Sequence, residues 1–186
     1  TYIASVNAIV YCGATPIFVD CLEDTWQVDS EDIAKKITSK TKAIMIVHLY
    51  GQSCDMDSIC KVAKENDIFL VEDCAEGFGT RYKGRHVGSF GDISTYSFFG
   101  NKTITAGEGG MVVTNNETLC RRAIHLKGQG LAEHRQYWHD VVGYNYRMTN
   151  ITCAIGQAQL ERSDELIAKK RKIADYYHSA FEGTHI

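Results

Sequence analysis

Residues Ile68 to Gly79 read IFLVEDCAEGFG, and this segment carries the main indication of the fold class. It opens with an apolar run of strand length and continues with two adjacent carboxylates, Glu72 and Asp73. A strand that is apolar at consecutive positions is typical of a parallel sheet with helices on both faces. Ligands bind such sheets at the carboxyl ends of the strands, so an acidic side chain there is placed to meet a cofactor. Alternatively, Asp73 only caps the turn that follows.

Short apolar runs alternate with helical patterns along most of the chain, which predicts an α/β fold with a mostly parallel sheet. Helices are expected after a cap at Asp29, after a cap at Asp55 or Asp57, and from Thr149 to about Phe181. Strands are expected at residues 16–20, 43–49, 68–72, 93–98 and 111–114.

The composition fits one globular domain and excludes several classes of protein. The 186 residues include 20 Lys plus Arg and 23 Asp plus Glu, a formal net charge of −3, so nothing predicts binding to nucleic acid. No apolar run approaches the roughly 20 residues that span a bilayer, so no membrane association is expected. Seven scattered cysteines without a Cys-x-x-Cys pair favour a reduced, cytoplasmic compartment and no metal site.

A second segment with candidate chemistry runs from Ser97 to Gly110 and reads SFFGNKTITAGEGG. Lys102 follows an aromatic strand and lies among small and polar residues, an environment that favours a restrained, nucleophilic amine. Ser97 offers a hydroxyl to a phosphate. The alternative for Lys102 is a solvated lysine on a loop.

A third segment, VGYNYRMTN at residues 142–150, supplies Asn145 and Arg147 as candidate anion ligands. Together, Asp73, Lys102 and Ser97 form the set that pyridoxal phosphate requires. The lysine binds the aldehyde, the carboxylate keeps the ring nitrogen protonated, and the hydroxyl holds the phosphate.

The chain resembles the DegT-type nucleotide-sugar aminotransferases. The segments that carry the resemblance are TYIASVNAI (1–9), HLYGQ (48–52), VEDCAEGFG (71–79), SFFGNKTITAGEGGM (97–111), VGYNYRMTN (142–150) and AIGQAQLER (154–162). The resemblance implies the large domain of a fold-type I aminotransferase, with a mostly parallel mixed sheet flanked by helices. It also implies pyridoxal phosphate as cofactor and amine transfer from glutamate to a nucleotide-linked 4-keto-6-deoxy sugar. HLYGQ, Glu76 and FFGNKTIT favour GDP-4-keto-6-deoxymannose as that sugar.

The resemblance also implies roles for individual residues. Lys102 matches the catalytic lysine that binds the cofactor and shuttles a proton, and relatives that remove a hydroxyl instead carry His there. Asp73 matches the partner of the ring nitrogen, and Glu76 matches a residue beside the ring. The remaining matches are Tyr2 stacked on the ring, Ser97 on the phosphate, and Asn145 reaching the phosphate of a neighbouring subunit in a homodimer.

The chain departs from the family in length, because the family's chains are about twice as long by the usual domain sizes. We expect an N-terminally incomplete cofactor domain at residues 1–160, beginning on a strand that carries Tyr2. A helical linker at 161–186 would lead to an absent small C-terminal domain. The alternatives are a non-catalytic remnant or interaction module, a dehydratase of the same fold, and a UDP-sugar aminotransferase.

Two further features are weaker candidates. His48 in HLYGQ is interpreted as structural, since histidines at strand ends are often only hydrogen-bonded. The polar loop at residues 129–139 carries His134, Arg135, Tyr137 and His139 and is either a substrate-facing loop or a solvated one.

Overall fold

The computed structural model describes residues 1–184, which form two units. The first unit comprises residues 1–97 and 110–147, and the second comprises residues 98–109 together with the chain from residue 148 onward. Residues 185 and 186, the end of the predicted linker, lie outside the described residues.

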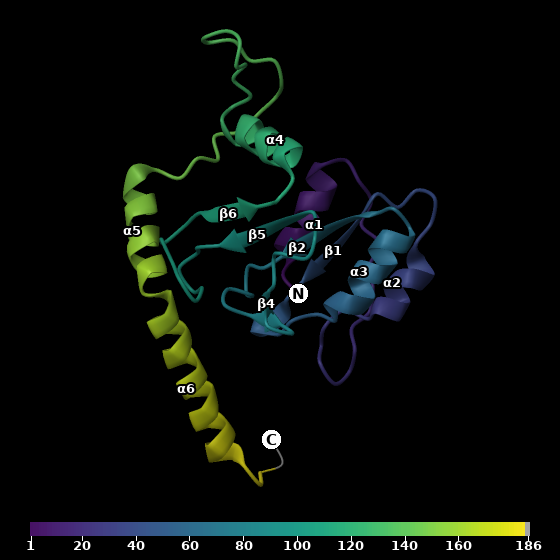
Figure 1. Cartoon of the computed structure of the whole chain (residues 1–186), viewed down its shortest axis with the longest axis vertical. Helices are drawn as coiled ribbons and strands as arrows, with labels where there is room; N and C mark the ends of the chain where they lie inside the picture. Colours follow the sequence, from purple (N-terminus) through teal and green to yellow (C-terminus); the bar gives the residue numbers. More distant parts are fainter. Residues whose placement is uncertain (185–186) are drawn as a thin grey trace. The chain divides into compact units, whose positions relative to one another are not determined.

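The first unit is built on a four-stranded sheet in the order β1-β2-β5-β6 (Figure 1). Its strands are β1 (Ala43–Val47), β2 (Phe69–Asp73), β5 (Ile93–Ser97) and β6 (Gly110–Val113). Strands β1, β2 and β5 are parallel, and β6 pairs antiparallel with β5. The predicted mostly parallel mixed sheet is therefore confirmed, with each of these four strands within two residues of its expected bounds.

The core lies between one face of this sheet and helices α2 (Ser30–Lys36) and α3 (Met56–Glu65). Burial alternates along β1 and β2, so Ile46 and Leu70 point to the same covered face. Ile59 of α3 packs in the same cluster and is fully buried. Each such side chain contributes roughly 1.5–3 kcal/mol when it leaves water. Both helices begin at predicted caps, where the carboxylates of Asp29 and Asp55 accept backbone N–H groups.

Two helices of the first unit were not expected. Helix α1 (Ile3–Tyr11) begins directly after Tyr2, so the prediction that Tyr2 lies on a strand is wrong. The run IASVNAIVY contains the β-branched residues of a strand and its cap residue makes no side-chain hydrogen bond, which left no local helix signal. Helix α4 (Glu117–Lys127) follows β6 and is capped by Asn116.

The strand predicted at residues 16–20 is absent. The segment has no partner strand among residues 1–184, and Ile17 and Phe18 are exposed. Only an isolated bridge between Cys21 and Val28 forms beyond it. A β-strand needs a neighbour for its backbone N–H and C=O groups, and an apolar run alone does not supply one.

Three short elements lie in the loops of the first unit. They are the 3₁₀ turn η1 (Leu49–Gly51) and the two-stranded antiparallel hairpin of β3 (Arg81–Tyr82) and β4 (Arg85–His86). Both the turn and the hairpin follow strands of the main sheet, so they shape the loops near its carboxyl end.

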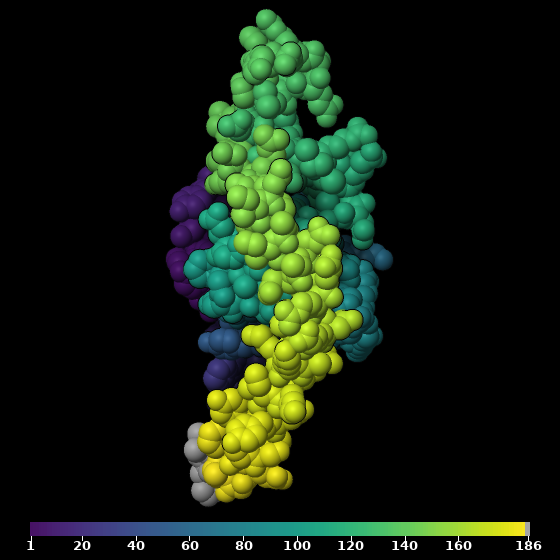
Figure 2. Space-filling view, turned by 90° about the vertical axis from the view of Figure 1, so that its left-hand side faces the viewer, coloured from purple at the N-terminus to yellow at the C-terminus, as the bar shows by residue number. Residues whose placement is uncertain are grey.

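The second unit contains the loop from Phe98 to Gly109 and two helices, α5 (Asn150–Glu161) and α6 (Ser163–Phe181). In Figure 2 the side chains of α5 and α6, coloured green to yellow, form one long band. The helix predicted from Thr149 to Phe181 is divided at Arg162, which ends α5 and precedes α6. Neither helix, nor any other within residues 1–184, has the length and hydropathy required to cross a membrane.

Candidate active site

Asp73 lies at the carboxyl end of β2, in the middle of the sheet. It pairs with Val47 of β1 on one side and with Thr95 of β5 on the other. Ser97 ends β5 two residues beyond Thr95, so both predicted ligands lie at the same edge of the sheet. The expected position of Asp73 at the carboxyl end of a parallel strand therefore agrees with the fold.

Both oxygens of Asp73 accept a hydrogen bond. Oδ1 accepts from the backbone N–H of Ala75 at 3.0 Å, so the capping role considered from the sequence exists. Oδ2 accepts from the hydroxyl of Ser5 in α1 at 2.6 Å. A carboxylate has about four lone-pair sites, so Asp73 retains acceptor capacity for a further N–H donor such as a protonated ring nitrogen. The two roles proposed for Asp73 are compatible.

Glu72, the neighbouring carboxylate, points to the opposite face of the sheet and is completely buried. Its Oε1 accepts from the N–H groups of Phe90 at 2.7 Å and Gly91 at 2.6 Å. Its Oε2 accepts from the N–H of Gly88 at 2.6 Å and contacts Nε2 of His48 at 3.1 Å. Burial acts to raise the pKa of Glu72, but these hydrogen bonds outweigh it and leave the pKa below its usual value. Glu72 therefore holds the loop at residues 88–91 and His48 in place from inside the protein.

His48 completes this network and has both ring nitrogens occupied. Nδ1 lies 3.2 Å from the backbone nitrogen of Cys54 and accepts its N–H, so Nε2 carries the proton that is donated to Glu72. His48, Glu72 and Cys74 together bring a nitrogen, an oxygen and a sulfur within 4.8 Å of one another, as metal ligands would. However, the ligand atoms of His48 and Glu72 are engaged in hydrogen bonds, and burial raises the pKa of the Cys74 thiol well above its usual value. The cluster is better described as a structural network, which agrees with the sequence-based interpretation of His48.

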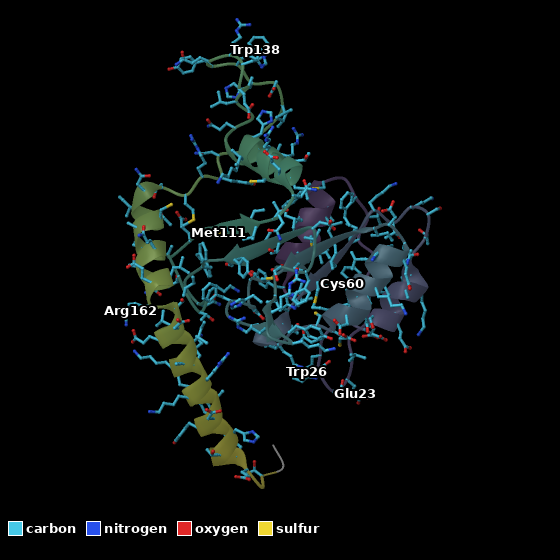
Figure 3. The ribbon with its side chains drawn as sticks, viewed as in Figure 1. Glu23, Trp26, Cys60, Met111, Trp138 and Arg162 are labelled. Carbon is cyan, nitrogen blue, oxygen red and sulfur yellow. The ribbon has the colours of Figure 1, made fainter. Side chains whose placement is uncertain are left out.

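Glu76 connects the loop after β2 with the HLYGQ segment after β1. Its Oε2 accepts the backbone N–H of Tyr50 at 2.7 Å, and the hydroxyl of Thr80 donates to the carbonyl of Gly51 at 2.6 Å. Tyr50 has a left-handed backbone with φ of 55°, which is costly for a bulky residue. Its exposed ring meets Trp26, labelled in Figure 3, edge to face with centroids 6.5 Å apart. This contact was not predicted from the sequence.

Tyr2 and Asn145 are both exposed. Tyr2 immediately precedes α1, three residues before Ser5, and is 77% exposed. Asn145 lies in the segment after α4, where it forms an isolated bridge with Gly128. Exposure leaves both side chains available for the predicted stacking and phosphate contacts.

The loop at residues 129–139 is closed at its base by His139, whose Nδ1 lies 2.8 Å from the carbonyl oxygen of Gln129. The guanidinium of Arg135 stacks 4.5 Å above the ring of Trp138, which Figure 3 labels. Tyr137 is 85% exposed. The substrate-facing role of this loop stays a prediction.

Lys102 belongs to the second unit and lies on a tight loop. Its backbone N–H donates to the carbonyl of Phe99 at 3.0 Å. Thr105 closes the loop, because its hydroxyl donates to the carbonyl of Phe98 at 3.0 Å and accepts the N–H of Gly107 at 2.9 Å. The lysine is half-buried and Ile104 beside it is buried, so the loop is restrained as expected.

These residues fit pyridoxal phosphate by the chemistry of their donor sets. The chain supplies a half-buried amine, a carboxylate with spare acceptor sites, and hydroxyl and amide donors for a phosphate.

Curated relatives match this chain over nearly its whole length. GDP-perosamine synthase from Escherichia coli O157:H7 is 69% identical over 177 residues, which are 95% of this chain and 49% of that protein. GDP-perosamine synthase from Vibrio cholerae is 54% identical over 183 residues, covering 98% of this chain and 50% of that protein. The chain thus spans about half the length of the curated relatives it matches.

Solved structures give the same result. Helicobacter pylori PseC, an aminotransferase involved in the biosynthesis of pseudoaminic acid, matches with a TM-score of 0.94 and 28% identity, over 100% of this chain and 50% of that chain. The pyridoxal-phosphate form of the putative sugar aminotransferase Spr1654 from Streptococcus pneumoniae matches with a TM-score of 0.91 and 33% identity, over 98% of this chain and 52% of that chain. The expected fold-type I aminotransferase scaffold is therefore confirmed. Residues 1–186 match the DegT/DnrJ/EryC1/StrS aminotransferase family throughout, and the chain belongs to this family of pyridoxal-phosphate-dependent aminotransferases.

Proposed function

We propose that this chain acts in transferring the amino group of glutamate to a nucleotide-linked 4-keto-6-deoxy sugar with pyridoxal phosphate as cofactor. The narrower proposal is conversion of GDP-4-keto-6-deoxymannose to GDP-perosamine. The observation that carries it is the high identity to the GDP-perosamine synthase of Escherichia coli over nearly the whole chain. Lysine at position 102 supports amine transfer over removal of a hydroxyl, because similar enzymes that remove one carry His there.

The proposed roles are those that the resemblance to the family implies for each side chain. Bound pyridoxal phosphate would supply an aldehyde that exchanges amino groups and a ring that withdraws electrons. Lys102 would hold the cofactor through Nζ and, once released, carry a proton to and from the reacting carbon. Asp73 would keep the ring nitrogen protonated, using the acceptor sites that Ser5 and Ala75 leave open. Glu76 would lie beside the ring.

Three further residues would bind the cofactor without taking part in proton transfer. Ser97 would donate its hydroxyl to the phosphate, and Tyr2 would stack on the ring. Asn145 would reach the phosphate held by a second subunit, so we propose a homodimer with shared sites. The exposure of Tyr2 and Asn145 supports these last two roles.

The assignment of residues 1–160 to the cofactor domain and of 161–186 to a linker also stays a proposal. We also propose a cytoplasmic location, which is supported by the seven cysteines, all of which are free.

The first test is cofactor binding. Pyridoxal phosphate added to the purified protein should give a visible absorption band, and borohydride should attach a pyridoxyl group to Lys102, identifiable by peptide mass spectrometry. Lys102→Ala should abolish both signals, whereas Lys40→Ala, which alters an exposed lysine, should keep them. Absence of any band in the parent would instead favour the non-catalytic interaction module.

The second test is substrate choice. The protein is incubated with glutamate and GDP-4-keto-6-deoxymannose, and separately with a UDP-linked 4-keto-6-deoxy sugar. We expect 2-oxoglutarate and an aminated sugar only with the GDP-linked substrate. Reaction with the UDP-linked sugar alone would keep the aminotransferase proposal and overturn the narrower one.

A further inference from the structure

We infer that Ser5 is a positioning residue of the cofactor site, which fixes the Asp73 carboxylate for its contact with the pyridoxal-phosphate ring. This inference rests on the proposed function, in which Asp73 pairs with the ring nitrogen. It adds a residue that sequence reasoning did not single out, 68 positions away from Asp73 along the chain.

The geometry of the contact is that of a strong hydrogen bond. The Ser5 hydroxyl lies 2.6 Å from Oδ2 of Asp73, within the range of hydroxyl donors to ionised carboxylates. Oδ1 is held separately by the N–H of Ala75. With one donor on each oxygen, the carboxylate cannot turn about its last torsion without losing both contacts. Ser5 therefore restricts the direction in which the remaining acceptor sites point.

The same bond fixes helix α1 to the sheet. Asp73 points away from the face that carries Glu72 and the core, so α1 lies against the other face. None of the residues of α1 is buried, and the hydrogen bond from Ser5 joins this helix to the end of β2. Tyr2 precedes Ser5 by about one helical turn. One hydroxyl thus links the residue proposed to stack on the ring with the residue proposed to pair with its nitrogen.

The test measures the affinity for pyridoxal phosphate and the pH dependence of its visible band, not only activity. Ser5→Ala removes the donor, and Ser5→Cys keeps the size with a much weaker donor. Both should weaken binding about tenfold, the loss expected for a hydrogen bond to a charged group. Ser5→Thr keeps a hydroxyl and should stay within about twofold of the parent. Ser39→Ala, at an exposed turn, is the control and should bind as the parent does.

A double-mutant cycle separates positioning from a general structural effect. If Ser5 acts through Asp73, adding Ser5→Ala to Asp73→Ala should change the affinity by less than about twofold. An equal tenfold loss in both backgrounds, or parent-like affinity and band in Ser5→Ala and Ser5→Cys, would overturn the inference. A parent protein that takes up no pyridoxal phosphate would refute the proposed function instead.

Discussion

Replacing Glu72 with Gln tests the network beneath the carboxyl end of β2, because the two side chains have the same shape and differ in hydrogen bonding. Oε1 and Oε2 of Glu72 each face two N–H donors, from Phe90 and Gly91 and from Gly88 and His48, respectively. A glutamine can keep its oxygen toward one pair only. Its NH₂ group then faces the other pair, and two buried donors lose their acceptor.

The magnitude follows from those two donors. Each buried donor without a partner costs about 1–3 kcal/mol, so Glu72→Gln should lose about 4 kcal/mol of the free energy of unfolding. That is a large part of the roughly 5–15 kcal/mol that keeps a typical domain folded. For a chain of this size, the melting temperature should fall by about 10 °C.

The assay is urea and thermal unfolding followed by circular dichroism at pH 7. Glu65→Gln is the matched control, because Glu65 is exposed, lies 3.9 Å from Lys61, and should contribute less than about 0.5 kcal/mol. A loss of less than about 1 kcal/mol in Glu72→Gln would show that the buried donors do not depend on the carboxylate, since at least one unpaired buried donor must cost that much.

The pH dependence gives a second check with a fixed sign. The pKa of Glu72 is lowered in the folded protein, so its stabilisation is complete above the unfolded value of about 4.3. It is lost as the pH falls through the lower folded value. The difference between parent and Glu72→Gln should therefore shrink below about pH 4, and a difference that grows in acid would contradict the assignment.

Three further predictions concern other parts of the chain. Gly88→Ala should cost at least about 2 kcal/mol in urea unfolding, because Gly88 has a φ of 82° and a Cβ there would overlap the hydroxyl of Tyr96. Thr149→Ala should cost about 1 kcal/mol and fray the start of α5 in hydrogen exchange, whereas Thr149→Ser should not. Glu165 should titrate by NMR near its lowered pKa of about 2, because the guanidinium of Arg162 and the ammonium group of Lys169 stabilise its charged form. Added salt should raise that pKa toward the usual value, since the group is exposed.

Strands β1 and β2 could be predicted from the sequence because they are short apolar runs that the fold buries on one face. Ile46 and Leu70 are examples, and both are core residues. The same reasoning was wrong for Ile17 and Phe18, whose run is as apolar but has no neighbouring strand within residues 1–184. The residues of a segment determine its propensity for the strand conformation, whereas a strand also requires a partner strand from elsewhere in the chain.

Helices, too, could be predicted only where the signal lies in the local sequence. Local sequence predicted a cap at Asp29, a cap at Asp55 or its neighbour Asp57, and a helix starting at Thr149. In the structure Asp29, Asp55 and Thr149 each accept a backbone N–H. Helix α1 has no capping side chain, and its attachment includes a bond from Ser5 to a strand far along the chain. Contacts of that kind leave no local pattern, so neither the helix nor the role of Ser5 could be predicted.

The two adjacent carboxylates show how one short motif serves two purposes. Side chains of a strand alternate between its faces, so Glu72 and Asp73 cannot share an environment. Glu72 is enclosed by four donors and has no acceptor site left for a ligand, while Asp73 accepts two hydrogen bonds and keeps room for a third. The strand register that buries Leu70 and Glu72 is therefore the register that presents Asp73 on the opposite face. A shift by one residue would bury Asp73 and expose Glu72, so the stability of the network and the position of the proposed cofactor ligand depend on the same pairing of β1, β2 and β5.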